Sequence, residues 1–179
     1  MRATIYALLK QHGATGDFHR IARLINDPEA IIQNALERED WPQAMKMLEE
    51  ENQSALYYAY SSSLLSHVPS ALCQGWINCG GIEAEQLLSV MASSLSKSAE
   101  CQKSVLRYLD TIIDGFISLS VANLHFSLMC SVSVEKAEQY VIGAVNDGSL
   151  GCDVSYALRT LQGRGFMLTI SVETERIRT

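Results

Sequence analysis

The chain has 179 residues, of which 47% are hydrophobic and only three are proline, and its formal net charge is −6. This length suits one domain or a segment of a longer array, and the apolar content excludes a disordered chain. Lysine and arginine occur singly rather than in clusters, which argues against a nucleic-acid-binding surface.

Short helices, separated by proline and glycine, are predicted for the first half of the chain. Asp27-Pro28 and Trp41-Pro42 each place a proline at the start of a helix, and Asp27 supplies a capping carboxylate. Asp17 is the expected cap of an earlier helix, and Gly80-Gly81 provides the left-handed exit that helix ends favour. The expected helices span residues 3–11, 17–25, 28–38, 41–52, 54–66 and 70–79.

The second half continues in the same way. Its clearest amphipathic pattern runs from Cys101 to Phe116. Gly115 to Val134 carries no charge over a length that could span a membrane, but its serines, Asn123 and His125 make insertion costly. A buried helix entered from a turn near Ser118–Ser120 is the better interpretation. The expected helices span residues 82–95, 101–116, 121–130, 135–145 and 153–162.

The order and length of these segments predict an all-α fold. Roughly eleven helices of 9–16 residues follow one another with short links, which makes consecutive helices antiparallel neighbours. Their recurrence favours an α-solenoid of helix pairs, a fragment of a longer array, with a compact bundle as the competing architecture. The expected pairs are 17–38, 41–66, 69–95, 101–130 and 135–162.

This interpretation divides the chain into three parts. Residues 1–16 form an N-terminal helix or array edge, and residues 17–163 form the α-solenoid. Residues 164–179 form an atypical tail, disordered or foreign to the array, in which Met167 to Glu173 alternate with the period of a strand. A lone strand after a row of helices has no partner with which to pair.

Asp110 and Asp114 are the one candidate for metal chemistry, because they lie one helical turn apart and could face the same way. A Mg²⁺ site of this kind needs a second acidic cluster on a facing helix, and the sequence offers none. A solvated helix face is therefore the preferred interpretation of the pair. No catalytic, metal or cofactor site is expected in the chain.

The cysteines and histidines show no local signature of a nucleophile or a zinc site. The cysteines are expected to be free and mostly buried in a reducing compartment, and the histidines to have structural or surface roles. These residues are Cys73, Cys79, Cys101, Cys130, Cys152, His12, His19, His67 and His125.

Three further features have a structural and a functional interpretation. Trp41 and Trp76 are expected to anchor the core or the contacts between repeats rather than to hold a ligand. The acid run Glu49–Glu51 is expected to be a solvated helix end, and its functional alternative is one side of a salt-sensitive docking surface.

Residues 26–81 also resemble a known family. An acid-aromatic helix start with alanine and leucine (Asp40, Trp41, Ala44, Leu48) precedes a tyrosine-rich helix that ends at Pro69 and a Trp76-Ile77 pair before a glycine. These features resemble the clathrin-heavy-chain-type repeat of the deep-orange (vacuolar protein sorting-associated protein 18) family. Later motifs keep the same order as in that family, so the resemblance covers about residues 17–163. These motifs are Ser104–Asp110, Ala122–Met129 and Asp153–Leu161.

The resemblance implies a non-catalytic scaffold subunit of the HOPS and CORVET tethering complexes, which act in vesicle-mediated protein transport and membrane fusion. Its implied partners are the other class C tether subunits, with no nucleic acid and no small-molecule ligand. Its implied place is cytoplasmic, peripheral on the late endosome, lysosome or vacuole membrane. The family's β-propeller and RING-type zinc domain have no counterpart here, since no strand-rich stretch precedes residue 17 and no zinc spacing occurs. A clathrin-like coat component or other helical-repeat adaptor is the alternative, and a small metal-dependent enzyme is less favoured.

Overall fold

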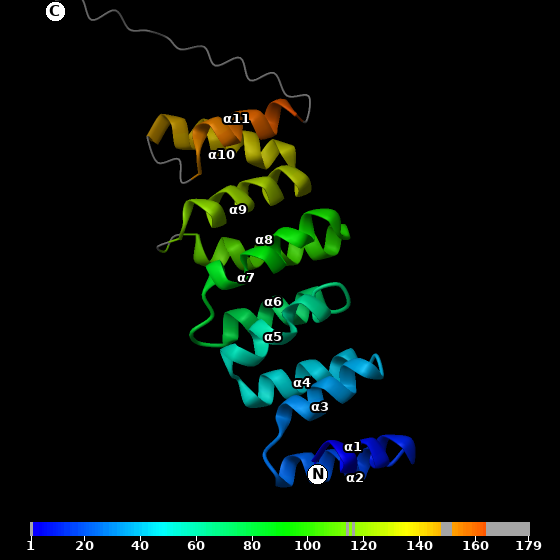
Figure 1. Cartoon of the computed structure of the whole chain (residues 1–179). Coiled ribbons are helices and arrows are strands. Elements are labelled where there is room, and N and C mark those ends of the chain that lie inside the picture. Colours follow the sequence, from blue (N-terminus) through cyan, green and yellow to red (C-terminus); the bar gives the residue numbers. More distant parts are fainter. Residues whose placement is uncertain (1, 114, 116, 148–151, 164–179) are drawn as a thin grey trace, which may run out of the picture.

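The computed structural model describes residues 2–113, 115, 117–147 and 152–163, and it shows a stack of helices that rises from the N-terminus (Figure 1). All described elements are helical, which confirms the all-α solenoid. The elements are α1 (Arg2–Gln11), α2 (Thr15–Leu24), α3 (Pro28–Glu37), α4 (Trp41–Glu51), α5 (Ser54–Leu64), α6 (Pro69–Asn78), α7 (Ala84–Ser93), the 3₁₀ turn η1 (Ser94–Ser96), α8 (Ala99–Ile112), α9 (Leu119–Val132), α10 (Val134–Asp147) and α11 (Val154–Gln162).

The proline-marked helix starts lie where the sequence predicts them. Asp27 and Asp40 are the N-caps of α3 and α4, and their carboxylates accept the backbone N–H groups of Ala30 and Gln43. Asp17 is not a cap, because α2 already begins at Thr15, and its carboxylate lies instead in the first turn. A negative charge is favourable there because it faces the positive end of the helix dipole.

The links before α3 and before α4 have the same geometry. In each, a residue with left-handed backbone precedes the capping aspartate: Asn26 has φ 52° and Glu39 has φ 57°. The Asp27 N–H then bonds the Ala22 carbonyl, and the Asp40 N–H bonds the Ala35 carbonyl. The two links that flank α3 therefore share one hydrogen-bond pattern.

The helices form two rows, one of odd-numbered and one of even-numbered elements. The contacts of α5 with α7, of α7 with α9 and of α9 with α11 define the odd row, and those of α4 with α6 and of α6 with α8 define the even row. The expected pairing of residues 69–95 is therefore wrong, since α6 packs mainly on α8 rather than on α7. Gly81, at φ 84°, turns the link towards the odd row.

Hydrogen bonds to N-cap residues join successive helices of the odd row. Tyr6 of α1 donates to the Asp27 carboxylate (3.1 Å), and the Glu83 N–H, before α7, donates to the Tyr58 hydroxyl of α5 (2.7 Å). Two more bonds of this kind run from the Ser118 N–H to Glu85 (3.0 Å) and from the Asp153 N–H to Asn123 (3.1 Å).

We call these four contacts the N-cap ladder. In three of the four, the first helix contributes its fifth residue: Tyr6, Tyr58 and Asn123. The N–H of an N-cap residue has no partner inside its own helix. Three contacts of the ladder give that group a partner on the preceding helix of the row, whereas Tyr6 bonds the Asp27 side chain instead. The ladder thereby helps to fix where the next helix begins.

The core consists of two apolar clusters that meet at α9. Val121, Leu124 and Leu128 belong to the main cluster, which extends from α2 to α9. Ala122, Phe126 and Cys130 belong to a second cluster with α10 and α11. Burial on both sides explains why the segment around α9 carries no charge. Among the described helices, none combines the length and the apolar character needed to cross a membrane.

The remaining boundaries deviate little from expectation. Residues 101–116 were expected to form one helix, but α8 ends at Ile112, where the Gly115 N–H turns back to the Ile112 carbonyl. The helix expected over residues 121–130 is longer, because Ser118 caps it through the Val121 N–H. The strand pattern in the tail 164–179 lies outside the described residues.

Candidate interaction surface

Of the two carboxylates Asp110 and Asp114, which were weighed as a metal site, the structure describes only Asp110. Asp110 accepts a hydrogen bond from His125 Nε2 at 2.7 Å, and His125 is only 3% exposed on α9. Asp110 therefore fastens α8 to α9 and satisfies a buried ring nitrogen. Asp114 lies outside the described residues. Within the part of the chain that the structure describes, no cluster of three or more potential ligands could hold a metal ion.

The five cysteines are buried thiols outside any disulfide bond, as predicted. Burial raises the pKa of Cys73 to about 12, where the nearby Cys101 adds to the effect. Burial also raises the pKa of Cys79 and Cys101, and the Cys101 thiol donates weakly to the Leu65 carbonyl at 3.5 Å. A nucleophilic cysteine needs a stabilised thiolate. These environments favour the neutral thiol.

The two tryptophans occupy different places in the stack. Trp76 is 2% exposed, donates through Nε1 to the Ser61 hydroxyl at 2.9 Å, and meets Tyr108 edge-on at 5.1 Å between ring centroids. It therefore joins α5, α6 and α8, which agrees with the predicted role as an anchor. Trp41 is half-buried and stacks on the exposed His67, with ring centroids 3.8 Å apart.

The other two histidines do not meet a potential nucleophile among the described contacts. His12 is exposed at the end of α1. His19 is half-buried on α2, and its Nε2 is buried without a hydrogen-bond partner. Burial lowers the pKa of His19, and the neighbouring guanidinium groups of Arg38 and Arg23 lower it further. These effects favour the neutral form of the ring, against a weaker opposite effect of Asp40.

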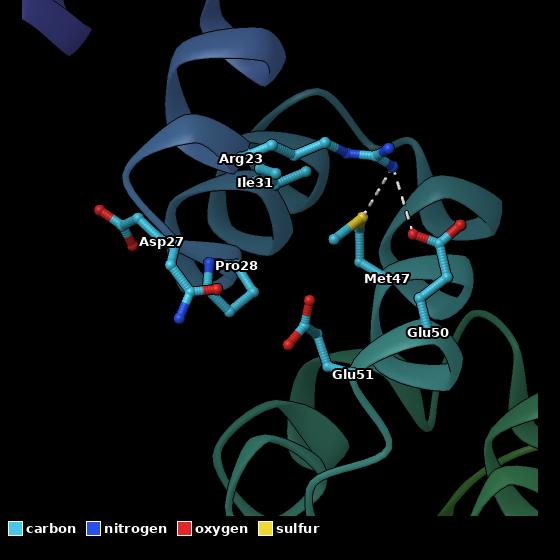
Figure 2. A pocket seen from close by; sticks show the side chains of 8 residues that line it. Arg23, Asp27, Pro28, Ile31, Met47, Glu50 and Glu51 are labelled. Atoms are coloured by element: carbon cyan, nitrogen blue, oxygen red, sulfur yellow. Dashed lines mark hydrogen bonds and ion pairs between the residues drawn. The ribbon is translucent and has the colours of Figure 1, made fainter.

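A cleft of about 190 Å³ lies where the end of α2, the start of α3 and the end of α4 meet (Figure 2). Arg23 spans its rim and donates to Glu50 at 3.2 Å and to the Met47 sulfur at 3.8 Å. Ile31 and Met47 contribute apolar surface, and Glu51 also lines the cleft. The predicted acid run thus forms part of a concave surface rather than only a helix end.

Acidic residues are concentrated in the segment that forms this cleft, and three of them, Asp27, Glu50 and Glu51, line it. Residues 27–51 contain eight acidic and two basic side chains, a net charge of −6 that equals the net charge of the whole chain. Glu50 is neutralised by Arg23 and approached by Lys46 at 3.8 Å, whereas Glu49 is exposed. α3 and α4 therefore present the most negative surface of the stack, which is a candidate for contact with another protein.

The sequence analysis did not predict that the acid run lies in one cleft with Arg23, Ile31 and Met47. A signal was present, because Lys10–Glu37 and Arg23–Glu50 are both ion pairs of residues 27 positions apart. Each pair joins a helix to the next but one. Such a spacing is meaningful only once the length of the repeat is known.

Comparison with known proteins supports the same architecture. Residues 29–170 match the family model described as VPS18, alpha-solenoid domain, second half. The vacuolar protein sorting-associated protein 18 homolog of Danio rerio is 22% identical over 172 residues. That match covers 93% of this chain, and the chain spans 18% of the length of this curated relative.

Proposed function

The chain belongs to the VPS18 family, as a second-half α-solenoid domain, and from that premise we propose that it is a non-catalytic scaffold segment of an endosomal or vacuolar tethering complex. In this role it holds other subunits of the class C complexes HOPS and CORVET. It reaches the late endosome, lysosome or vacuole membrane as a peripheral part of the complex. Its contribution to protein transport and membrane fusion is to position its partners.

The family match across residues 29–170 is the observation that carries this proposal. The use of the side chains adds support. Hydrogen bonds between helices use the polar groups of Trp76, Asp110 and the N-cap ladder residues. An elongated stack offers a large surface for partners. Vacuolar sorting is the process named for the Danio rerio relative.

Affinity purification of the tagged chain from cells tests the proposal. We expect class C tether subunits to co-purify with it, and the chain to sediment with late endosomal, lysosomal or vacuolar membranes. The alternative of a clathrin-like coat component predicts assembly into cages instead. A chain that co-purifies with none of these subunits and never sediments with those membranes would contradict the proposal.

The acidic surface can be tested in the same assay. If the acid run docks a basic surface, the double substitution Glu49→Lys and Glu51→Lys should weaken co-purification, and raised salt should weaken it in the unchanged chain. Glu50 is left intact because it pairs with Arg23. Charge reversal of Glu138 on the distant α10 is the matched control. Unchanged co-purification would leave the acid run as a solvated helix end.

A further inference from the structure

The junction between α4 and the next two helices is thinly packed, and so is the junction between α2 and α3, which the ion pairs Lys10–Glu37 and Arg23–Glu50 cross. α3 packs extensively on α4, and α6 packs extensively on α8, whereas α4 makes far fewer contacts with α5 and α6. The structure describes every residue from 27 to 83, so the sparse packing of α4 on α5 and α6 is a property of these helices. Regions with few buried contacts open and bend at the lowest cost in free energy.

The N-cap ladder also skips this junction. The fifth residue of α3 is Ile32, which is fully buried and has no polar group to offer to the N-cap of α5. That N-cap is Gln53, whose side chain makes no capping hydrogen bond. The odd row is therefore tied between α1 and α3 and from α5 to α11, but not between α3 and α5.

Few directional contacts cross the junction. The link consists of Asn52, with left-handed backbone at φ 48°, and Gln53. On one edge the Cys79 thiol donates weakly to the Asn52 carbonyl at 3.6 Å. On another edge Trp41 and His67 stack with an interplanar angle of 6°. Gln53 also donates to the Glu51 carboxylate across the link at 3.4 Å, in an exposed position. Among the described contacts of residues 27–83, no ion pair crosses the junction, and the shared core is apolar.

Apolar contacts hold the two sides together without fixing their angle. The main core cluster continues across the junction, so both sides belong to one folded unit. Burial of apolar surface is non-directional, whereas hydrogen bonds and ion pairs fix geometry. Hinges are a few loop residues that absorb changes in backbone angle while packed elements move as bodies. The link at Asn52–Gln53 has these properties.

We infer that the α4–α5 junction is a hinge between two arms, α1–α4 and α5–α11, and that the Trp41–His67 stack is a clasp that limits its opening. The acidic cleft lies on the first arm, and the Trp76 contacts lie on the second. Rotation at Asn52–Gln53 changes the angle between these surfaces. The scaffold thereby adapts the spacing of its partners.

Distances between spin labels on the full chain test the hinge. One label pair, Arg20→Cys with Gln139→Cys, crosses the junction from α2 to α10, and the control pair, Ser62→Cys with Gln139→Cys, stays within the second arm. All three positions are exposed, and the native cysteines are buried. The unsubstituted chain gives the background labelling. We expect a broader distance distribution for the crossing pair than for the control pair.

Variants of the clasp make the test specific. His67→Ala removes the stack and should broaden the crossing distribution further, with no change in the control pair. His67→Phe keeps a ring against Trp41 and should preserve the original width, and the exposed His12→Ala should change neither pair. The inference fails if the two pairs have equal widths, or if His67→Ala leaves the crossing distribution unchanged or broadens both pairs alike.

Discussion

The helices α1–α4 and the helices α5–α9 share an apolar core but differ in the polar contacts that join them. In α1–α4, the ion pairs Lys10–Glu37 and Arg23–Glu50 and the Tyr6–Asp27 hydrogen bond join helices near the surface. In α5–α9, buried aromatic rings and hydroxyl groups join them. Exposed ion pairs contribute about 0–1 kcal/mol each, while loss of a buried aromatic ring costs about 3–5 kcal/mol. Loss of one of these surface ion pairs should therefore be less damaging than loss of a buried ring such as Trp76.

Trp76→Ala should have the largest effect. It removes a ring that is 2% exposed, and it leaves the Ser61 hydroxyl without its donor. We expect the free energy of unfolding to fall by about 3–5 kcal/mol, measured by chemical denaturation. The neighbouring Ile77 is 40% exposed, so Ile77→Ala should cost much less. Similar losses for the two variants would remove the basis for the comparison.

Gly75→Ala should cause the next largest loss of stability. A Cβ at this position would lie 2.7 Å from the ring and the hydroxyl of Tyr57, which is 1% exposed. The ring has no free space into which to move, so we expect a loss of roughly 1–3 kcal/mol from overpacking. Gly16 has no atom within 4 Å of the corresponding position. Gly16→Ala, in the first region, should be neutral or mildly stabilising, and chemical denaturation of both variants makes the comparison.

These two positions also show what the sequence could reveal. Proline, aspartate and glycine act within a few residues of where they stand, so the helix boundaries could be predicted closely. The burial of Trp76 could be predicted from its apolar surroundings. Its partner Ser61 could not, because the two residues are 15 positions apart and meet only after α5 and α6 pack.

The pairing of the helices and the candidate surface were harder to predict for the same reason. The contact of α6 with α8 depends on how Gly81 and Tyr58 direct the link before α7. The cleft depends on Arg23 reaching Glu50 across two links. Both follow from the repeat geometry, which weak sequence similarity between repeats conceals.

Asp27→Ala and Asp40→Ala compare two caps with the same hydrogen-bond pattern. Each should cost about 1 kcal/mol, since each removes the acceptor of an N-terminal backbone N–H. Asp27 also accepts the Tyr6 hydroxyl, so its replacement should cost about 0.5–1.5 kcal/mol more. Tyr6→Phe should lower the free energy of unfolding only by this additional amount, about 0.5–1.5 kcal/mol. Equal losses at the two aspartates would show that this contact of the N-cap ladder contributes nothing.

Glu39→Gly should stabilise the first region. Glu39 has φ 57°, a left-handed conformation that costs a residue with a Cβ about 1–2 kcal/mol and glycine almost nothing. Part of the gain is offset by the greater freedom of glycine in the unfolded chain, so we expect a net gain of roughly 0.5 kcal/mol. Glu29→Gly, inside the first turn of α3, should instead destabilise. A loss of stability at Glu39 would show that its side chain has an energetic role.

The smallest effect should come from pH, through His19. Burial and the charges of Arg38 and Arg23 lower its pKa below the ordinary 6.5, against a weaker opposite effect of Asp40. As the pH falls below about 6.5, His19 of the unfolded chain binds a proton before His19 of the folded chain does. The free energy of unfolding therefore decreases with falling pH, until the pH passes the lower pKa of the folded state. His19→Gln should reduce this acid dependence of the melting temperature, whereas the exposed His12→Gln should not. Because the ring is only half-buried, water offsets part of the penalty. An acid dependence unchanged in His19→Gln would assign it to carboxyl groups whose pKa is lowered in the folded chain, such as Glu37 and Glu85.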